Sequence, residues 1–158
     1  MSIICFTDGS AKNNGKLNCR ASFSVVWPNN MEFNCAEEIE DFEGIKPSNN
    51  RGEYSGAIKA LEIADLIDTT REKKLDIYTD SMLLVNTMTK WIANWKRNNW
   101  IKSDGNVVLN VDLLKRLLQL TEKRKTSFIY VKAHTKEMSF EAIHNRLADS
   151  LAKSAIFT

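Results

Sequence analysis

The order of strand-like and helical segments constrains the fold of this chain more than any other feature. Three short apolar runs come first, over Ser2–Asp8, Arg20–Trp27 and Met31–Ile39, with polar turns between them. Two further runs, Leu75–Thr79 and Ser127–Lys132, each follow a helical stretch. Short turns favour antiparallel neighbours, whereas helical crossovers favour parallel ones. The chain is therefore predicted to have an α/β fold, one mixed five-stranded sheet with helices packed on its faces.

The apolar residues between and after these runs recur with a helical period. They predict helices over Arg51–Asp68, Met82–Thr89 with an extension into a tryptophan-rich stretch, Val111–Glu122 and Glu141–Ile156. In the last helix the expected inner stripe is Ile143, Leu147, Leu151 and Ala155. No repeat, low-complexity segment or linker interrupts the pattern, so residues 1–158 are expected to form a single domain.

Charge is spread unevenly along the chain, although the formal net charge is only +2. Acids gather between Glu32 and Glu43, and from Lys90 to Lys102 every charged residue is basic. Three tryptophans, Trp91, Trp95 and Trp100, lie among these bases. A basic face of this kind can bind a polyanion locally even when the total charge is near zero.

The cysteines and the hydropathy restrict where the chain works. Its 3 cysteines form no CxxC pair, which argues against a disulfide framework and against a zinc site. A reducing, intracellular and specifically cytoplasmic location is therefore expected. No apolar stretch is long enough to cross a membrane and no signal peptide precedes the first strand, so no membrane partner is expected. We expect a monomer.

Four acids are placed where they could meet. Asp8 and Asp80 each end an apolar strand as Thr-Asp followed by Gly or Ser, so parallel pairing would bring both to one carboxyl edge of the sheet. Glu53 lies in the first turn of the first long helix, and Asp149 lies four residues after Asn145 in the last helix. Clustered acids repel one another unless a cation lies between them. Two Mg²⁺ ions held by such acids could hydrolyse a phosphodiester.

Each acid also has an ordinary structural interpretation. Asp8 with Gly9 could make a turn, Asp80 could cap the following helix, and Glu53 could complement a helix dipole. Asp149 could be a solvated helix charge. Taken singly, most of these interpretations would be preferred; the matching strand ends of Asp8 and Asp80 favour the cluster.

Six segments, in order, resemble the motifs of type 1 ribonucleases H. They are Phe6–Ser10, Ser48–Glu53, Tyr78–Ser81, the stretch from Trp91 to Lys96 with Trp100 and Asn110–Leu113, Val131–His134, and Asn145–Asp149. The resemblance runs colinearly from Ile4 to Ala155 and so covers nearly the whole chain. One such motif would be weak evidence, but six at similar spacings are specific.

The resemblance implies an RNase H-like fold with a basic handle, and an endonuclease that cuts the RNA strand of RNA–DNA hybrids. It implies two-metal-ion hydrolysis that leaves 5′-phosphate and 3′-hydroxyl ends. The ions would be Mg²⁺, with Mn²⁺ as a substitute, and their ligands Asp8, Glu53, Asp80 and Asp149. It also implies that His134 assists in proton transfer or product release.

The resemblance further implies contacts with the hybrid. Asn14, Asn49, Asn50 and Met82 match minor-groove contacts, and Glu53 with main-chain groups near Gly9 would read the 2′-hydroxyl. The asparagines could equally serve in loops and turns. Lys46, Ser48 and Asn110 match a pocket for a DNA phosphate, Trp91 matches an aromatic that packs on a DNA sugar, and Lys96 and Arg97 are expected to contact phosphates.

Three departures from the family pattern stand out. The hairpin after Asp8, over residues 12–17, has fewer glycines than usual. Gly52 replaces a larger residue before Glu53, which could loosen the helix start. The loop after His134 is longer and lacks its usual glycine, which puts the reach of the histidine in question.

Other functions remain open. A ribonuclease H-like module could hold hybrids without cutting them, although binding needs bases more than acids. The domain could play an assembly role within a larger polymerase. A DNA-directed nuclease of the same superfold is the nearest rival among enzymes.

Overall fold

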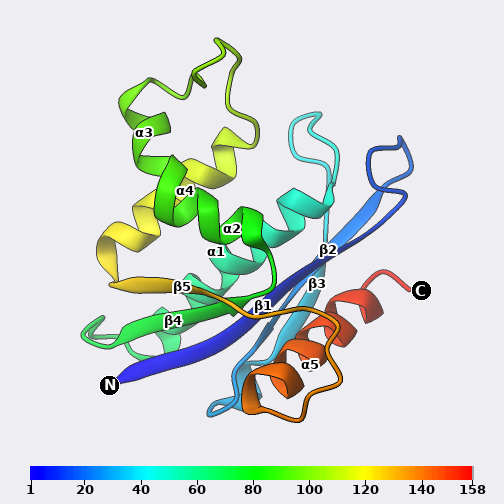
Figure 1. Cartoon of the computed structure of the whole chain (residues 1–158), viewed down its shortest axis with the longest axis vertical. Coiled ribbons are helices and arrows are strands. Elements are labelled where there is room, and N and C mark those ends of the chain that lie inside the picture. The colour runs from blue at the N-terminus through cyan, green and yellow to red at the C-terminus, as the bar shows by residue number, and fades with distance from the viewer. Residues whose placement is uncertain (158) are drawn as a thin grey trace.

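A mixed sheet of five strands forms the centre of the molecule, in the order β3-β2-β1-β4-β5 (Figure 1). The computed structural model describes residues 1–157. The strands are β1 (Ser2–Lys12), β2 (Arg20–Val26), β3 (Cys35–Ile39), β4 (Lys74–Thr79) and β5 (Thr126–Tyr130). β1, β2 and β3 pair antiparallel, whereas β4 is parallel to both β1 and β5. The predicted mixed sheet is confirmed.

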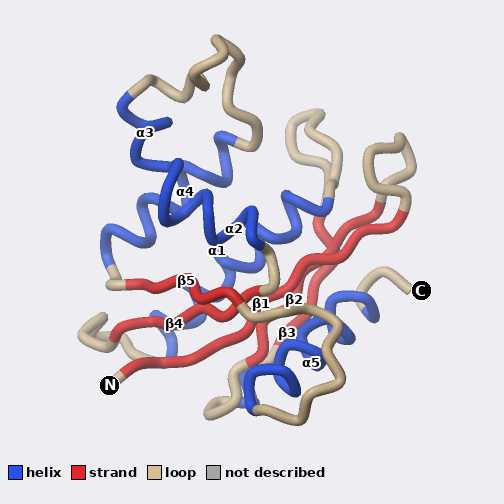
Figure 2. Tube along the Cα trace, in the orientation of Figure 1, coloured by secondary structure: helices blue, strands red, loops and turns tan. Residues whose placement is uncertain are grey.

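The helices divide between the two faces of the sheet (Figure 2). They are α1 (Asn49–Ile67), α2 (Met82–Asn86), α3 (Ile92–Arg97), α4 (Val111–Lys123) and α5 (Phe140–Ser154). α5 lies on one face and the others on the opposite face (Figure 1). A turn of π-helix over Thr87–Trp91 joins α2 to α3, so the helix predicted to continue from Met82 into the tryptophan-rich stretch does so with a bulge. No helix within residues 1–157 is both long and apolar enough to span a membrane.

β1 is covered on both faces, which explains why its sequence is continuously apolar before Asp8. Cys5 packs into the larger core with Val25 and the helices α1 and α4. The next residue, Phe6, points to the other face and packs with Val26 and with Ala148 of α5. β1 is therefore packed between two apolar layers, and the side chains at its carboxyl end are held on a rigid backbone.

The hairpin strands differ from the sequence prediction at two points. Asp8 and Gly9 make no turn, because β1 continues to Lys12 and pairs with β2 as far as Arg20. The predicted third strand begins late: Met31–Phe33 is a 3₁₀ turn, and β3 starts only at Cys35. The Asn34 side chain accepts a 2.6 Å hydrogen bond from the main-chain nitrogen of Trp27, which closes the connection before the strand begins.

The predicted inner stripe of α5 is confirmed only in part, because Leu147 and Leu151 pack against the core around Phe6 whereas Ile143 does not. Ile143 is 39% exposed, and the buried residues are Ala142, Asn145, Ala148 and Ala152. Ser22 and Ser24 of β2 donate hydrogen bonds of 2.5 and 2.6 Å to the main-chain oxygens of Ala152 and Ala148. The small alanine side chains allow this close approach of the helix backbone to the sheet, and Leu147 and Leu151 pack beside them against the same face.

Arg124 ties the carboxyl end of α1 to the start of β4. Its guanidinium donates to the Asp68 carboxylate at 2.9 Å and to the Asp65 carboxylate at 3.0 Å. It also donates to the main-chain oxygens of Lys73 at 2.8 Å and of Asp68 at 2.7 Å. The Arg124 side chain is buried. This cluster fixes the end of α1 that lies away from Glu53.

Candidate active site

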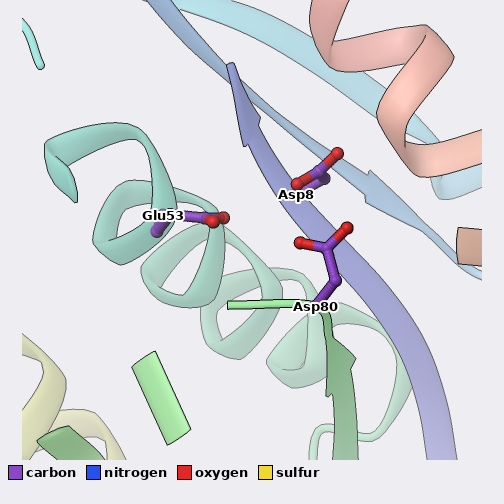
Figure 3. A group of neighbouring side chains, drawn as sticks. All are labelled: Asp8, Glu53 and Asp80. Atoms are coloured by element: carbon purple, nitrogen blue, oxygen red, sulfur yellow. The ribbon is translucent and has the colours of Figure 1, made fainter. Parts of the chain in front are cut away.

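Three carboxylates meet at the carboxyl edge of the parallel strands. The parallel pairing of β1 with β4 ends at Thr7 opposite Thr79. Asp8 follows Thr7 and Asp80 follows Thr79 directly along the sequence. Glu53 reaches the same place from α1, and the three side chains point toward one another (Figure 3). One carboxylate oxygen from each lies within 4.8 Å of the others. The prediction that Asp8 and Asp80 emerge side by side is confirmed.

Glu53 is brought into the cluster by unusually close packing of α1 on the sheet. α1 begins at Asn49, so Glu53 lies in the second helical turn and not in the first as predicted. A Cβ on Gly52 would lie 2.6 Å from the main-chain oxygen of Ser22, and one on Gly9 would lie 2.8 Å from the Glu53 nitrogen. Gly52 therefore does not loosen the helix start. It permits the contact that buries Glu53.

Burial and mutual repulsion raise the pKa values of two of these acids. The pKa of Asp8 rises to about 10, first because the carboxyl is buried and then because Glu53, Asp80 and Asp149 carry like charge. The pKa of Glu53 rises to about 8 through burial and the charge of Asp80, although hydrogen bonds from the Gly9 main chain and Ser81 oppose the rise. Such displaced pKa values are typical of functional sites.

The carboxylates fit a divalent cation. Asp8 Oδ2 and Glu53 Oε1 are buried without a hydrogen-bond partner among residues 1–157. Buried oxygens of this kind cost free energy unless something neutralises them. Mg²⁺ and Mn²⁺ prefer oxygen ligands, and Asp8, Glu53 and Asp80 offer three converging ones.

Asp149 lies beside this cluster and has a cationic neighbour of its own. It raises the pKa of Asp8 through its charge and a side-chain hydrogen bond. Its carboxylate also pairs with Lys153, one helical turn later, at 3.0 Å. Asp149 is thus near Asp8 but is not one of the three converging ligands, and its role as a metal ligand stays a prediction.

The structural alternatives for Asp8 and Asp80 are wrong. Asp8 lies inside β1 and not in a turn. The helix after Asp80 is capped by Ser81, whose hydroxyl accepts a hydrogen bond from the Leu84 nitrogen at 3.1 Å. Asp80 instead accepts a 3.3 Å hydrogen bond from the side-chain amide of Asn145. Sequence reasoning noted the spacing of Asn145 from Asp149 but did not assign it to Asp80.

His134 lies in the connection between β5 and α5. The residue is exposed and has a left-handed backbone, with φ of 55°. Its catalytic role stays a prediction. The connection around it is held by α5: Arg146 donates to two of its main-chain oxygens, those of Thr135 and Glu137.

Five of the eleven predicted substrate contacts line one groove. The groove, about 470 Å³ in volume, is lined by Asn14, Lys46, Ser48, Asn50 and Asn110 among others. Its lining residues come from three loops, over residues 13–19, 40–48 and 98–110, and from the first turn of α1. The three loops can be followed in Figure 1. The Asn49 nitrogen donates to the Asn14 side chain at 3.0 Å and so joins two of the loops.

Arg51 orients one wall of this groove and was missed by the sequence analysis. It is buried and donates to Asn110 Oδ1 at 3.1 Å. A bidentate pair with Asp112, at 3.0 and 2.8 Å, holds the guanidinium in place. Ser48, for its part, caps α1 by accepting from the Arg51 nitrogen at 3.1 Å.

The remaining predicted contacts lie outside the groove. Met82 and Trp91 are exposed, and the Trp91 ring lies 5.7 Å from that of Trp95. Lys96 pairs with Glu122 of α4 at 3.5 Å, and Arg97 donates to the side chain of Asn94. Lys96 and Arg97 therefore each have a protein partner, and a role for them in binding a hybrid stays a prediction.

Comparisons with known proteins agree with this geometry. The family model described as RNase H matches residues 1–157. Human Ribonuclease H1 is 32% identical over 96% of this chain and 49% of its own length, so the chain spans about half of that relative. The Ribonuclease H of Francisella philomiragia is 32% identical over 98% of this chain and 90% of its own length.

A solved structure shows the same fold. The LC11-RNase H1 crystal structure, determined in complex with an RNA/DNA hybrid, aligns with a TM-score of 0.67 at 18% identity and covers 98% of this chain and 96% of that one. The family match over the described residues, the two relatives above 30% identity and the carboxylates at the sheet edge agree. The chain belongs to the ribonuclease H family, as a member of its type 1 group.

Proposed function

We propose that this chain hydrolyses the RNA strand of RNA–DNA hybrids with the help of divalent cations bound at the sheet edge. The observation that carries the proposal is the cluster of Asp8, Glu53 and Asp80, in which Asp8 Oδ2 and Glu53 Oε1 are buried without a hydrogen-bond partner among residues 1–157. The relatives named as ribonucleases H, and the LC11 enzyme in complex with a hybrid, support the same substrate.

The side chains of the cluster would hold two cations, Mg²⁺ by preference and Mn²⁺ as a substitute. Bound there, the cations supply Lewis acidity and lower the pKa of the attacking water. Asp8, Glu53 and Asp80 would supply the converging carboxylate oxygens, and Asp149, whose charge acts on Asp8, would add a fourth. Asn145 would keep the Asp80 carboxylate oriented through its 3.3 Å hydrogen bond. Cleavage would leave a 5′-phosphate and a 3′-hydroxyl.

The hybrid would be held by groups on both sides of the cluster. The groove of Asn14, Lys46, Ser48, Asn50 and Asn110 offers amides, a hydroxyl and an ammonium, which are donors suited to a phosphate of the DNA strand. Asn49 and Met82 would touch the minor groove, and Gly9 with Glu53 would read the 2′-hydroxyl. Trp91 would pack on a sugar, while Lys96 and Arg97 would contact phosphates.

The remaining parts of the proposal concern the whole chain. Residues 1–158 would act as one catalytic domain and as a monomer. Cys5, Cys19 and Cys35 are unpaired, which favours a reducing compartment such as the cytoplasm. His134 would assist with proton transfer or product release.

The decisive experiment compares four duplexes of one sequence: RNA–DNA hybrids labelled on either strand, duplex RNA and duplex DNA. With Mg²⁺ only the RNA strand of the hybrid should be cut, and an excess of chelator should stop the reaction. Asp8→Asn protein prepared in parallel controls for contaminating nuclease. Cleavage of duplex DNA would favour a DNA-directed nuclease, binding without cleavage would favour a hybrid-binding module, and full activity in chelator would overturn the metal requirement.

A further inference from the structure

The connection between β5 and α5 is long, yet it is held at three places. At its start the Val131 nitrogen donates to the Thr79 oxygen at 2.9 Å, which extends the pairing of β5 with β4. At its end Ser139 caps α5 by accepting from the Ala142 nitrogen at 3.2 Å. Between these two anchors lie residues 132–138, which include His134 and no glycine. Among residues 1–157, the side chain that anchors the middle of this loop is that of Arg146.

Arg146 projects from α5 and binds the loop through its main chain. One guanidinium nitrogen, Nη1, donates to the oxygens of both Thr135 at 2.9 Å and Glu137 at 2.7 Å. The other, Nη2, lies 3.8 Å from the sulfur of Met138. A planar guanidinium can hold two carbonyls at once because its donors have a fixed geometry. The two carbonyls lie on either side of Lys136, and the first belongs to Thr135, the residue directly after His134.

The position of Arg146 on α5 connects the loop to the carboxylates. The residue before it, Asn145, is the hydrogen-bond donor to Asp80. Three residues after it comes Asp149, which lies beside Asp8. One turn of α5 therefore carries the group that orients Asp80, the anchor of the His134 loop and the fourth acid of the site.

We propose that Arg146 is a positioning residue that fixes the loop of His134 relative to the carboxylate cluster, and that it takes over the anchoring that a shorter loop would provide by its length. The catalytic part of this inference rests on the proposed function, since it acts through His134. The structural part, that the guanidinium holds residues 135–137 in place, does not depend on any activity.

The structural part can be tested by proteolysis. The Lys136–Glu137 bond lies between the two anchored carbonyls, and a protease must unfold the segment locally to cut it. In Arg146→Met, a lysine-specific protease should cut after Lys136 about tenfold faster or more, at an unchanged melting temperature. Arg116→Met is the matched control, because Arg116 makes only an exposed pair with Glu62. Equal cutting rates in Arg146→Met and wild type would overturn the proposal.

The catalytic part needs a double-mutant comparison. If Arg146 acts through His134, Arg146→Met should lower kcat for the hybrid by no more than His134→Ala does, and KM should stay unchanged. Combining the two substitutions should be no worse than His134→Ala alone. Arg146→Lys, which keeps a donor, should recover part of the rate.

Additive losses, or a rise in KM alone, would overturn the inference, because they would indicate that Arg146 contacts the substrate or acts independently of the histidine. If Arg146→Met itself unfolds, the same measurements on Arg146→Lys decide the matter. If the wild-type chain cuts no hybrid, the proposed function fails, whereas the proteolysis result still decides whether Arg146 anchors the loop.

Discussion

Two clusters of buried charge lie at opposite ends of β4 and have opposite electrostatics. At the start of the strand, Arg124 is surrounded by the acids Asp65 and Asp68 and by main-chain oxygens. At its end, Asp80 meets Asp8 and Glu53 with no basic side chain in the group. The first cluster is compensated, whereas the second gathers like charges.

The pKa values move in opposite directions for this reason. Hydrogen bonds from Thr70, Lys73 and Arg124 hold the pKa of Asp68 well below its usual range. Burial and like charge raise the pKa values of Asp8 and Glu53 to about 10 and about 8. Buried like charges lower the free energy of unfolding, and such unfavourable arrangements are typical of functional sites. The contrast therefore favours a structural role for the acids around Arg124 and a functional role for the carboxylates at the other end of β4.

The largest expected effect comes from neutralising the uncompensated cluster. Asp8→Asn or Asp80→Asn should each remove nearly all turnover, a loss on the order of 10³-fold or more, because a cation ligand is lost. In metal-free buffer the melting temperature of Asp8→Asn should hold near neutral pH, where the Asp8 carboxyl with its pKa of about 10 is already protonated, and should rise at alkaline pH, where like-charge repulsion is relieved. Hybrid cleavage and thermal unfolding of the same preparations measure both. A variant that unfolds or cuts normally would contradict the assignment.

Breaking the compensated cluster around Arg124 should have the reverse effect, a loss of stability with little loss of activity. Arg124→Met leaves Asp68 buried without its partner, and removal of one member of a buried pair is strongly destabilising. The melting temperature should fall by about 10 °C, while cleavage well below the new transition should stay near wild type. Arg71→Met is the control, because Arg71 pairs with Asp65 at the exposed surface at 3.2 Å. Loss of activity in a folded Arg124→Met would show that the two ends of β4 are coupled.

The pH dependence of stability distinguishes the clusters with less perturbation. Asp8 and Glu53 have higher pKa values in the folded protein than in the unfolded chain. The stability that this difference contributes is fully present below about pH 4. It is lost as the pH rises through about 8 for Glu53 and about 10 for Asp8. In chelator, the melting temperature should fall by a few degrees from pH 5 to pH 9. Mg²⁺ should flatten this fall, and Asp8→Asn should reduce it. A melting temperature that is independent of pH in chelator would argue against the raised pKa values.

The same measurement at acid pH reports on the compensated cluster. The pKa of Asp68 is lowered, so the stability that it contributes is present above the unfolded value near pH 4 and is lost as the pH falls below it. Arg124→Met should therefore lose less stability than wild type on acidification.

The smallest effect is expected where charge is exposed. Lys96 pairs with Glu122, and both side chains are 59% exposed, so the pair itself adds little stability. Lys96→Ala combined with Arg97→Ala should leave the melting temperature unchanged and weaken hybrid binding. Each lost phosphate contact should lower the slope of log K against log salt by about 1. An unchanged slope would remove this stretch from the binding surface.

The sequence sufficed where neighbours along the chain decide the outcome. The apolar period fixed the helices to within a few residues, and the strand order with its crossovers predicted the mixed sheet. It failed where packing between distant segments decides. The centre of the inner face of α5 is formed by alanines that fit against Ser22 and Ser24, with Leu147 and Leu151 beside them, and the predicted Ile143 lies outside it. Gly52 similarly takes its meaning from the main-chain oxygen of Ser22 across the interface.

For the candidate site, the sequence by itself determined which acids are present and that Asp8 and Asp80 follow parallel strands. Periodicity and crossover rules reach that far because they are local. The resemblance to type 1 ribonucleases H named Glu53 as well, but only the tertiary structure decided that close packing of α1 brings it to them. The same holds for the contacts by which Asn145 holds Asp80 and Arg146 holds the loop of His134. These contacts join segments far apart in the chain, and their distances depend on how closely helices pack on the sheet, which no spacing along the sequence records.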